Sequence, residues 1–262
     1  MTAFGSAVRH APNDLPPPPV TLPPHAALFL DLDGTLAPFM PRPEQVGPDA
    51  RRAALLDDLS RALDGRLAVV SGRALEDLDR ILEGRIPALA AVHGLVRRGA
   101  RGIERAKPHA DLDQARGVLR DLARGDKGLL FEDKGLSVAL HYRNVPSAAE
   151  AVIEAAERLA QASELVLQLG DMVAELRTPG QDKGKSVSAF LREAPFDGAC
   201  PVFVGDDLTD EDGFAAAARL GGYGVLVGPE RPTQASYRLE DCNAVLDWLG
   251  LTVQTQGGEA DA

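Results

Sequence analysis

Short apolar runs alternate with helical patterns in the first and last parts of the chain. The apolar runs cover residues 26–32, 67–70, 88–92, 201–204 and 224–227. Uninterrupted runs of this length are typical of strands that are buried on both faces of a parallel sheet. Helical patterns lie between them, at residues 48–63, from about 74, at 185–193 and between 207 and 224, and a final one follows at 241–249. This alternation predicts a right-handed, doubly wound α/β core.

The pattern changes between residues 101 and 178. Two successive sets of one helix and two strands are expected there, at 111–123, 128–132, 136–141, 147–162, 164–169 and 172–177. The sequences Asp133-Lys134-Gly135 and Gly170-Asp171 mark the two hairpin turns. We therefore predict an α+β cap domain at 101–178, inserted into a core domain that comprises residues 25–100 and 179–250.

Residues 1–24 and 251–262 are expected to lie outside these two domains. The prolines from Pro16 to Pro19, with Pro23 and Pro24, can neither donate ladder hydrogen bonds nor continue a helix. An extended leader is expected, acting as a plain tether rather than as a ligand of a proline-binding module. The polar, glycine-bearing tail from 251 is expected to be flexible.

The composition narrows the choice of compartment and partners. The formal net charge of -11 disfavours nucleic acid and anionic membranes as partners, and an anionic substrate would need a locally positive pocket. Two cysteines, Cys200 and Cys242, are too few for a disulfide framework, which favours a reducing compartment. No segment suits a signal peptide or a membrane span. We expect a cytoplasmic protein that is a monomer or a weak oligomer.

Two carboxylates, Asp31 and Asp33, occur where the first apolar run opens into a loop. Ligands of parallel sheets bind at this carboxyl edge. One carboxylate can attack phosphorus to form an acyl phosphate, while the other protonates the leaving oxygen and later activates water. Gly34 permits a tight turn, so that backbone N–H groups beyond it can face phosphate oxygens. The pattern is that of phosphoryl-transfer chemistry.

A second acidic pair, Asp206 and Asp207, follows the run 201–204. Carboxylates crowded at one edge need a cation, and Mg²⁺ prefers hard oxygen ligands. Ser71 ends another apolar run and is expected to donate its hydroxyl and backbone N–H to phosphate at a helix start. A plain helix cap at Ser71 would need no function at all.

A lysine near residue 183 is expected to complete the site. The charge of Lys183 could hold the nucleophile and the transferring phosphoryl group. Lys185 is the competitor, but it lies where the expected helix should already be running. Lys183 is preferred, since Gly184 after it permits a close backbone approach.

Taken together, these residues resemble the motifs of the haloacid dehalogenase-like phosphatases. The matching segments are Asp31-Leu32-Asp33-Gly34-Thr35, Ser71, Lys183 and Gly205-Asp206-Asp207. The resemblance implies a Rossmannoid core in which Asp31 is the nucleophile and a Mg²⁺ ligand. It also implies that Asp33 is the acid/base and a main-chain ligand, that Asp206 is the remaining protein ligand, and that Asp207 either supports the metal ligands from outside or acts on the metal through water.

Finer features are similar to the trehalose-6-phosphate phosphatases. They are the extended motif at 205–212 and the cap segments Glu132-Asp133-Lys134, Ser137, His141-Tyr142-Arg143 and Glu175-Leu176-Arg177. This likeness implies that Glu132, Lys134 and Glu175 bind glucose hydroxyls, which both donate and accept hydrogen bonds. The segment Leu95-Val96-Arg97 departs from the subfamily, which usually has a small and an acidic residue there. The expected substrate contacts are Gly34, Thr35, Gly72, Arg73, His93, Gly94, Glu132, Lys134, Arg143 and Glu175.

The sequence thus predicts a Mg²⁺-dependent phosphatase for trehalose 6-phosphate, a phosphorylated disaccharide, with an aspartyl-phosphate intermediate and a cap that opens and closes. A phosphatase of the same fold for another sugar phosphate, such as sucrose 6-phosphate, is the first alternative, and only the cap would distinguish it. A phospho-accepting signalling domain has no place for the insertion at 101–178. A catalytically silent regulatory domain is disfavoured because all four motifs are present.

Overall fold

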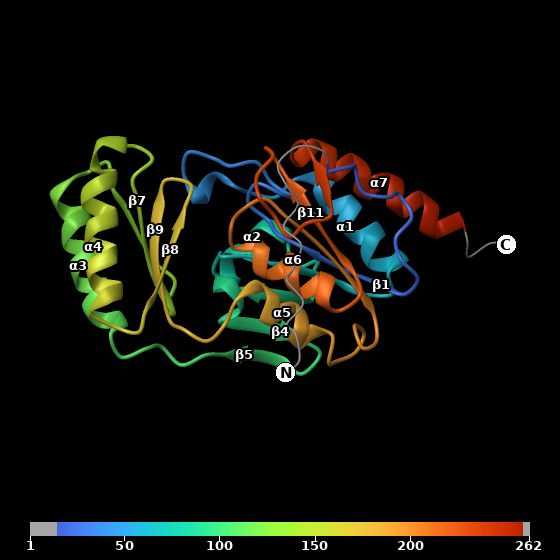
Figure 1. Ribbon diagram of the computed structural model, residues 1–262, viewed down its shortest axis with the longest axis horizontal. Helices are drawn as coiled ribbons and strands as arrows, with labels where there is room; N and C mark the ends of the chain where they lie inside the picture. The colour runs from blue at the N-terminus through green and yellow to red at the C-terminus, as the bar shows by residue number, and fades with distance from the viewer. Residues whose placement is uncertain (1–14, 259–262) are drawn as a thin grey trace, which may run out of the picture. The chain divides into compact units, whose positions relative to one another are not determined.

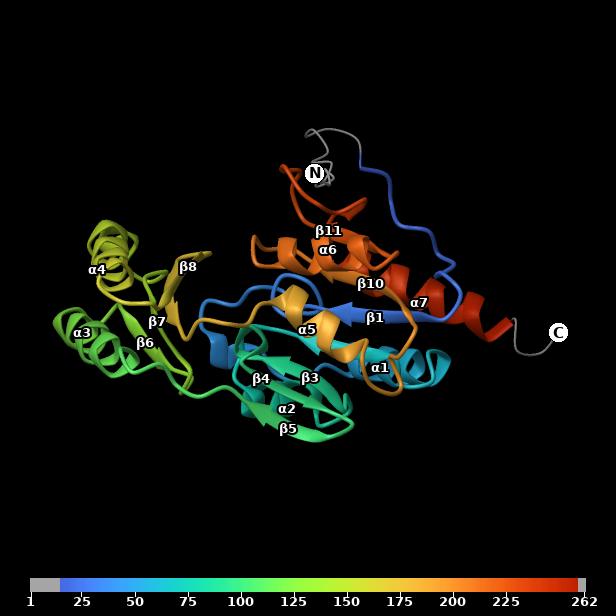
Figure 2. The same ribbon diagram turned by 60° about the horizontal axis from the view of Figure 1, so that its bottom comes forward.

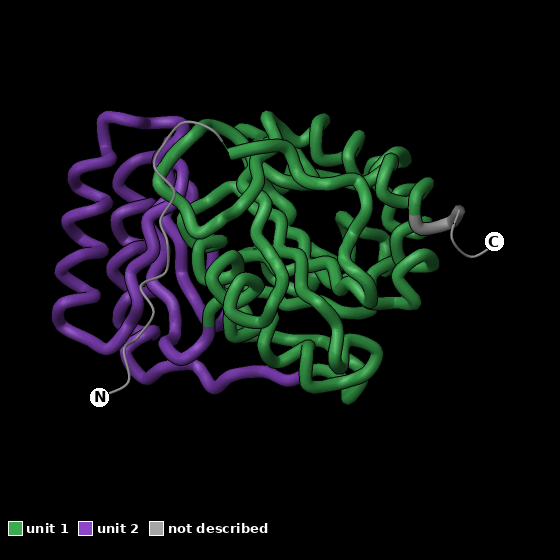
Figure 3. Tube along the Cα trace, turned by 45° about the vertical axis from the view of Figure 1, so that its right-hand side comes forward, with its two compact units in different colours: residues 1–103, 182–262 green, residues 104–181 purple. Residues whose placement is uncertain are grey.

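The computed structural model describes residues 15–258, which fall into two compact units (Figure 3). Within the described residues, one unit comprises 15–103 and 182–258, and the other comprises Glu104–Gln181. The sequence analysis had placed the boundaries at residues 101 and 178. The predictions for residues 1–14 and 259–262 lie outside the described part of the chain.

An eight-stranded sheet forms the first unit, in the order β12-β11-β10-β1-β2-β3-β4-β5. Figure 1 labels β1, β4, β5 and β11 of this sheet. The strands are β1 (Ala26–Leu30), β2 (Leu67–Val70), β3 (Ala88–Ala91), β4 (Val96–Gly99), β5 (Gly102–Arg105), β10 (Cys200–Gly205), β11 (Tyr223–Val227) and β12 (Tyr237–Leu239). Neighbours from β12 to β3 are parallel, whereas β4 is antiparallel to β3. The predicted α/β core with a parallel sheet is confirmed.

Five helices accompany this sheet in the described residues. They are α1 (Ala50–Ala62), α2 (Leu75–Leu82), α5 (Lys183–Phe190), α6 (Asp210–Arg219) and α7 (Cys242–Gly258). The connections through α1 and α2 step from β1 towards β3, whereas α6 steps the other way, from β10 to β11. Right-handed crossovers that step in opposite directions place their helices on opposite faces of the sheet. Phe29 and Phe203 of the sheet pack with Phe190 of α5 and Phe214 of α6 in one apolar core.

The leader from residue 16 to residue 22 is attached to the core unit and is not a free tether. Its carbonyls accept hydrogen bonds at Pro16 from the N–H of Arg238, 3.0 Å, and at Pro19 from the indole N–H of Trp248, 2.9 Å. Leu22 is 3% exposed. Prolines cannot donate to a ladder but their carbonyls still accept, so an extended proline-rich segment can bind at a sheet edge.

The flexible tail predicted from residue 251 is wrong up to residue 258, because α7 continues to Gly258. Thr252 is buried, and its hydroxyl donates to the carbonyl of Trp248 one turn earlier. The hydroxyl of Thr255 donates to the carbonyl of Val20, 3.1 Å. Contacts with the leader and the core therefore stabilise a helix end whose polar composition suggested fraying. None of the helices in the described range has the length and apolar character that a membrane span requires.

The second unit is a four-stranded antiparallel sheet in the order β6-β7-β9-β8, covered by two helices on one face. Its elements are α3 (Leu112–Gly125), β6 (Leu130–Asp133), β7 (Ser137–His141), α4 (Ala149–Gln161), β8 (Val166–Gly170) and β9 (Val173–Arg177). Figure 2 shows α3 and α4 side by side on the same side of the strands. The predicted twofold helix-strand-strand order is confirmed.

Period-two alternation explains the two faces of this small sheet. Val138, Leu140 and Leu176 pack against α3 and α4. The opposite parity carries polar side chains: Glu132 of β6 and Glu175 of β9 both pair with Ala139 of β7, so the two acids lie in one row across the sheet. The face without helices is thus built for polar contacts.

Candidate active site

Four neighbouring parallel strands bring the predicted core motifs to one edge. Asp31 follows β1, Ser71 follows β2, His93 follows β3 and Asp206 follows β10. These strands are adjacent in the order β10-β1-β2-β3. Carboxyl ends of parallel strands meet at the same edge, so four segments far apart in the sequence converge there.

Asp31 and Lys183 form a buried ion pair at the centre of this edge. Nζ of Lys183 lies 3.0 Å from Oδ2 of Asp31. Burial raises the pKa of Asp31 well above its usual value, opposed by the charge of Lys183 and reinforced by nearby acids. Burial alone would lower the pKa of Lys183, but the charges of Asp210 and Asp31 raise it above its usual range. Lys183 therefore stays protonated beside the carboxylate.

The structure brings Lys183, and not Lys185, to this centre. Helix α5 already begins at Lys183, two residues earlier than expected, and Asp182 caps it by accepting the N–H of Lys185, 2.7 Å. The Lys185 side chain is 59% exposed and pairs with Asp182. A Cβ on Gly184 would lie 2.3 Å from the carbonyl oxygen of Asp212, so glycine permits the close approach of α5 and α6.

Asp210 is a site residue that the sequence analysis did not single out. It is fully buried at the start of α6, and its Oδ1 accepts from Nζ of Lys183, 2.6 Å. Its Oδ2 accepts the N–H groups of Asp206, 3.0 Å, and Asp207, 2.9 Å. Asp210 thus fixes both the lysine and the turn after β10. A carboxylate four residues beyond Asp206, at a helix start, was the available signal.

Asp206 completes a cluster of carboxylates that could hold a metal ion. Carboxylate oxygens of Asp31, Asp206 and Asp210 all lie within 4.8 Å of one another. Burial raises the pKa of Asp206 to about 7, and Asp210 adds to this effect, so the charged form needs a cation. Because Asp210 is already occupied by Lys183 and two N–H groups, Asp31 and Asp206 have the oxygens that fit Mg²⁺.

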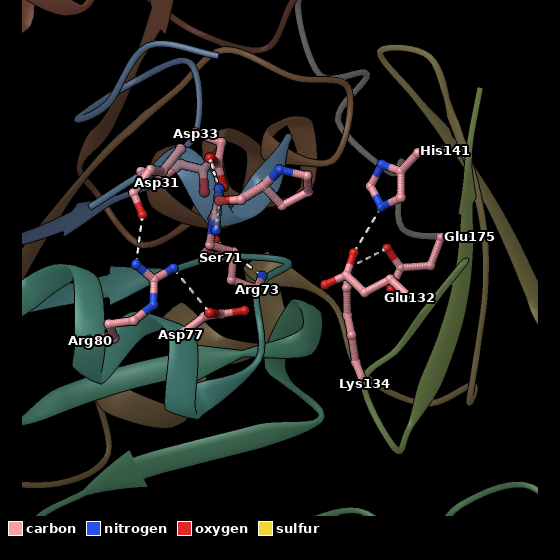
Figure 4. Close-up of polar contacts among 12 residues, drawn as sticks. Asp31, Asp33, Ser71, Arg73, Asp77, Arg80, Glu132, Lys134, His141 and Glu175 are labelled. Carbon is pink, nitrogen blue, oxygen red and sulfur yellow. Dashed lines mark hydrogen bonds and ion pairs between the residues drawn. The ribbon is translucent and has the colours of Figure 1, made fainter. Parts of the chain in front are cut away.

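The other two predicted metal-site residues have their carboxylates outside this cluster. Oδ1 of Asp207 accepts the N–H of Leu208, 2.6 Å, and its carbonyl accepts from Arg231, 2.9 Å. Asp33 points its carboxylate at Arg73 (Figure 4). A role of Asp33 through its main-chain carbonyl, and of Asp207 through water, stays a prediction.

Gly34 and Thr35 support Asp206 directly. Gly34 has a φ of 81°, and a Cβ there would lie 2.2 Å from Oδ2 of Asp206. Both the backbone conformation and the close approach therefore require glycine. Thr35 is fully buried and donates its hydroxyl to Oδ1 of Asp206, 3.2 Å.

Ser71 differs from its prediction in two respects. Its N–H is bonded to the carbonyl of Ala90, 2.8 Å, where it extends the β2–β3 ladder, so it does not point to a ligand. Helix α2 begins only at Leu75, with Ala74 as its N-cap, so Ser71 is not at a helix start. The Ser71 hydroxyl accepts the N–H of Arg73, 3.3 Å, which leaves its own hydrogen available for donation.

Residues after β3 have an unusual backbone. Val92, His93 and Gly94 all have positive φ, at 47°, 55° and 89°. The imidazole of His93 fills the space where a Cβ on Gly72 would lie, at 2.6 Å. Non-glycine residues in the left-handed region are strained and persist only where the surroundings determine them. This segment places His93 beside the turn that contains Ser71.

The segment that departs from the subfamily pattern is buried in the first unit. Leu95 and Val96 are 1% and 2% exposed. Arg97 forms an ion pair with Glu193, and its guanidinium lies 5.1 Å from the ring centroid of Phe190. In this chain the segment therefore supports the packing of α5.

The helix-free face of the second unit carries a chain of ion-pair and hydrogen-bond contacts. Nζ of Lys134 lies 2.9 Å from Oε2 of Glu175 and 3.9 Å from Oε2 of Glu132. His141 Nε2 lies 2.8 Å from the same oxygen of Glu132 (Figure 4). Burial raises the pKa of Glu132, but the charge of Lys134 and the hydrogen bond from His141 outweigh it and lower the pKa overall.

Lys134 and Glu175 do not form an ordinary surface ion pair, because their side chains are only 8% and 6% exposed. Arg143, also predicted as a substrate contact, lies apart from this chain of contacts and pairs with Asp171 in the β8–β9 turn, 2.7 Å. His141 contacts Glu132 on this face, although it was not predicted as a site residue. Its position two residues after Ala139 on β7 put it on the polar face.

Comparison with known proteins decides the family. The trehalose-phosphatase family model matches residues 29–243, a range that includes every site residue described above. The chain belongs to the trehalose-phosphatase family. A trehalose-6-phosphate phosphatase of Escherichia coli (strain K12) is 41% identical over 226 residues, which cover 85% of each chain.

Further relatives agree with this family membership. A probable trehalose-phosphate phosphatase of Sinorhizobium fredii is 38% identical over 79% of each chain. A solved trehalose-6-phosphate phosphatase related protein has a TM-score of 0.71 at 26% identity, covering 89% of this chain and all of that one. The C-terminal domain of the C. albicans trehalose-6-phosphate phosphatase has a TM-score of 0.77 at 24% identity, over 88% and 93%, and supports the fold. The family resemblance inferred from the motifs is confirmed.

Proposed function

We propose that this chain hydrolyses trehalose 6-phosphate to trehalose and inorganic phosphate through an aspartyl-phosphate intermediate. The observation that carries the proposal is the buried contact between Asp31 and Lys183, fixed by Asp210 at the carboxyl edge of the sheet. Membership of the trehalose-phosphatase family and the names of its E. coli and S. fredii relatives support the substrate.

In the first step an oxygen of Asp31 attacks the phosphorus, and the bond between phosphorus and the sugar oxygen breaks. Asp33 gives its proton to that oxygen, which leaves as the sugar hydroxyl. In the second step water attacks the phosphorus of the aspartyl phosphate and gives a proton to Asp33, and the electron pair of the broken bond returns to Asp31. Lys183 stabilises the charge on the transferring group in both steps.

Asp31 and Asp206 would hold Mg²⁺, whose charge reduces the repulsion between the anionic nucleophile and the anionic substrate. In their present arrangement the carboxylates of Asp31, Asp206 and Asp210 are close enough to repel one another strongly. Lys183 brings one positive charge to both Asp31 and Asp210. When all three carboxylates are ionised, their three negative charges and the one positive charge of Lys183 leave two negative charges, which supports the need for a divalent ion.

Glu132, Lys134 and Glu175 of the second unit are proposed to bind the glucose hydroxyls. Two carboxylates accept hydrogen bonds and one ammonium donates them, which matches hydroxyl groups that do both. Their mutual contacts hold these side chains in place before substrate binds, so that little side-chain entropy is lost on binding. A buried polar set of this kind discriminates strongly against ligands that leave it unpaired.

Two neighbouring residues of β6 provide a matched experiment. Glu132→Ala should raise KM for trehalose 6-phosphate about tenfold or more, while the constants for a small aryl phosphate stay unchanged, because only the disaccharide has hydroxyls to lose. Asp133 has the opposite parity on the strand and pairs with Arg116, 2.7 Å, so Asp133→Ala is the control. Equal losses for both substrates in Glu132→Ala would mean that Glu132 only supports the fold.

A further inference from the structure

Arg73 binds the carboxylate of Asp33 through two nitrogens of its guanidinium group. Its Nε donates to Oδ2 of Asp33 at 2.7 Å, and its Nη2 donates to Oδ1 at 2.8 Å (Figure 4). The third nitrogen, Nη1, donates to the carbonyl of Pro43 at 3.0 Å. A bidentate contact of this kind fixes the plane of a carboxylate as well as its position.

The Arg73 side chain is itself firmly placed. It is 9% exposed and belongs to the turn between β2 and α2, whereas the Asp33 side chain is 26% exposed. A partly exposed carboxylate is thus bound to a buried partner.

Three arginines bind the carbonyls of the segment 43–47, which follows the Asp33 loop. Arg73 binds the carbonyl of Pro43, Arg80 of α2 that of Val46 at 2.9 Å, and Arg52 of α1 that of Gly47 at 2.6 Å. Only Arg73 among these three also contacts Asp33. The contacts of Arg52 and Arg80 with the segment 43–47 are therefore separate from the contact between Arg73 and Asp33. A substitution at Arg80 removes a contact of the first kind alone.

We propose that Arg73 is a positioning residue that acts through Asp33, and that it is not a direct contact of the substrate. This inference rests on the proposed function, because it assigns Arg73 to the proton transfer that Asp33 carries out. The guanidinium fixes the carboxyl group of Asp33 through one lone pair of each oxygen, so that a remaining lone pair can carry the proton that passes to the leaving oxygen. The carbonyl of Pro43 keeps the guanidinium in place. Arg73 had been predicted from the sequence as a substrate contact, so the two roles need separate tests.

Leaving-group dependence distinguishes the two roles. The value of kcat/KM reports the steps up to release of the leaving group, so it includes the protonation by Asp33 but not the later attack of water. A sugar alkoxide needs that proton, whereas the phenolate from an activated aryl phosphate leaves without it. Arg73→Met should therefore lower kcat/KM for trehalose 6-phosphate by about tenfold to a hundredfold, and that for the aryl phosphate much less.

A double-mutant cycle with Asp33→Asn tests whether Arg73 acts through Asp33. The effect of Arg73→Met on kcat/KM for trehalose 6-phosphate should disappear in the Asp33→Asn background, because the group that it positions can no longer donate a proton. Arg80→Met is the matched control, since it removes one contact to the segment 43–47 and leaves the Asp33 contact intact. The ratio of the two substrates should not change in that variant.

Arg73→Met could instead lower kcat/KM equally for both substrates, with an effect that adds fully to that of Asp33→Asn. This result would show that Arg73 binds the phosphate and would overturn the inference. Unchanged kcat/KM values for both substrates in Arg73→Met would overturn the inference as well. Should Arg73→Met not fold, Arg73→Lys takes its place in the cycle, because it keeps the charge but loses the bidentate contact. Failure of the wild-type protein to release phosphate from trehalose 6-phosphate would be a different result, which refutes the proposed function itself.

Discussion

Nζ of Lys183 lies 3.0 Å from Oδ2 of Asp31, and the two side chains are only 3% and 7% exposed. In such a buried place the lysine charge acts on the nucleophile and the transferring phosphoryl group with little screening. Lys183→Met should lower kcat by about a hundredfold to a thousandfold, the range observed when a preorganised electrostatic partner is removed. The melting temperature should also fall, because Asp31 and Asp210 lose their cation.

Lys185→Met is the control for this measurement, since the Lys185 side chain is exposed and two positions away on the same helix. Steady-state kinetics and thermal unfolding of both variants should separate them clearly. If the two substitutions lower kcat to the same extent, Lys183 has no special part in the reaction.

The contribution of Asp206 to the stability of the metal-free protein should fall as pH rises from about 4 to 7. Burial raises the pKa of Asp206 to about 7, against a usual value of 3.8 in the unfolded chain. Over this window the folded protein binds a proton that the unfolded chain has lost, so the free energy of unfolding decreases with rising pH. Mg²⁺ binds the ionised carboxylates and should therefore raise the melting temperature more at pH 7.5 than at pH 5.

Calorimetry with Mg²⁺ or with chelator at the two pH values tests this prediction. The substitution Asp206→Asn serves as the internal comparison, because it removes the group that loses the proton. It should reduce both the pH dependence and the Mg²⁺ effect. The same pH dependence of metal-free stability in Asp206→Asn and in the wild-type protein would contradict the assignment.

The leader should contribute to folding through Leu22. Leu22→Ala removes a side chain that is 3% exposed and should lower the free energy of unfolding by about 2–4 kcal/mol. Val20→Ala alters a side chain that is 41% exposed and should change the free energy of unfolding by less than about 0.5 kcal/mol. Urea unfolding of the two variants measures the difference. A neutral Leu22→Ala would mean that the leader is dispensable for the core.

Sequence reasoning found those strands that are buried on both faces, because an apolar run is all that such a strand needs. The run 67–70, for example, coincides with β2. It missed β4, β5 and β12, whose polar or exposed residues carry no such pattern; all four residues of β5 are exposed. Edge strands are determined by the neighbour with which they pair, and that partner is not visible in a local window.

The site residues likewise divide into those that a local sequence pattern reveals and those that depend on tertiary partners. Motif residues at strand ends could be located, since topology alone brings them to one edge. The role of Asp210 depends on a lysine 27 positions earlier and on two N–H groups in a turn, which no local pattern reveals. The N–H of Ser71 is likewise taken by Ala90 through ladder pairing that extends one residue past β2. Tertiary hydrogen bonds decide which polar groups remain available to a ligand.

The most direct test of the account is phosphate release from trehalose 6-phosphate, sucrose 6-phosphate, glucose 6-phosphate and an aryl phosphate, each with Mg²⁺ and with chelator. We predict the highest kcat/KM for trehalose 6-phosphate and loss of the activity on chelation. A higher value for another sugar phosphate would contradict the substrate assignment while leaving the chemistry of Asp31 intact. Undiminished release in chelator, or no release from any of the four, would contradict the mechanism proposed for the buried carboxylates.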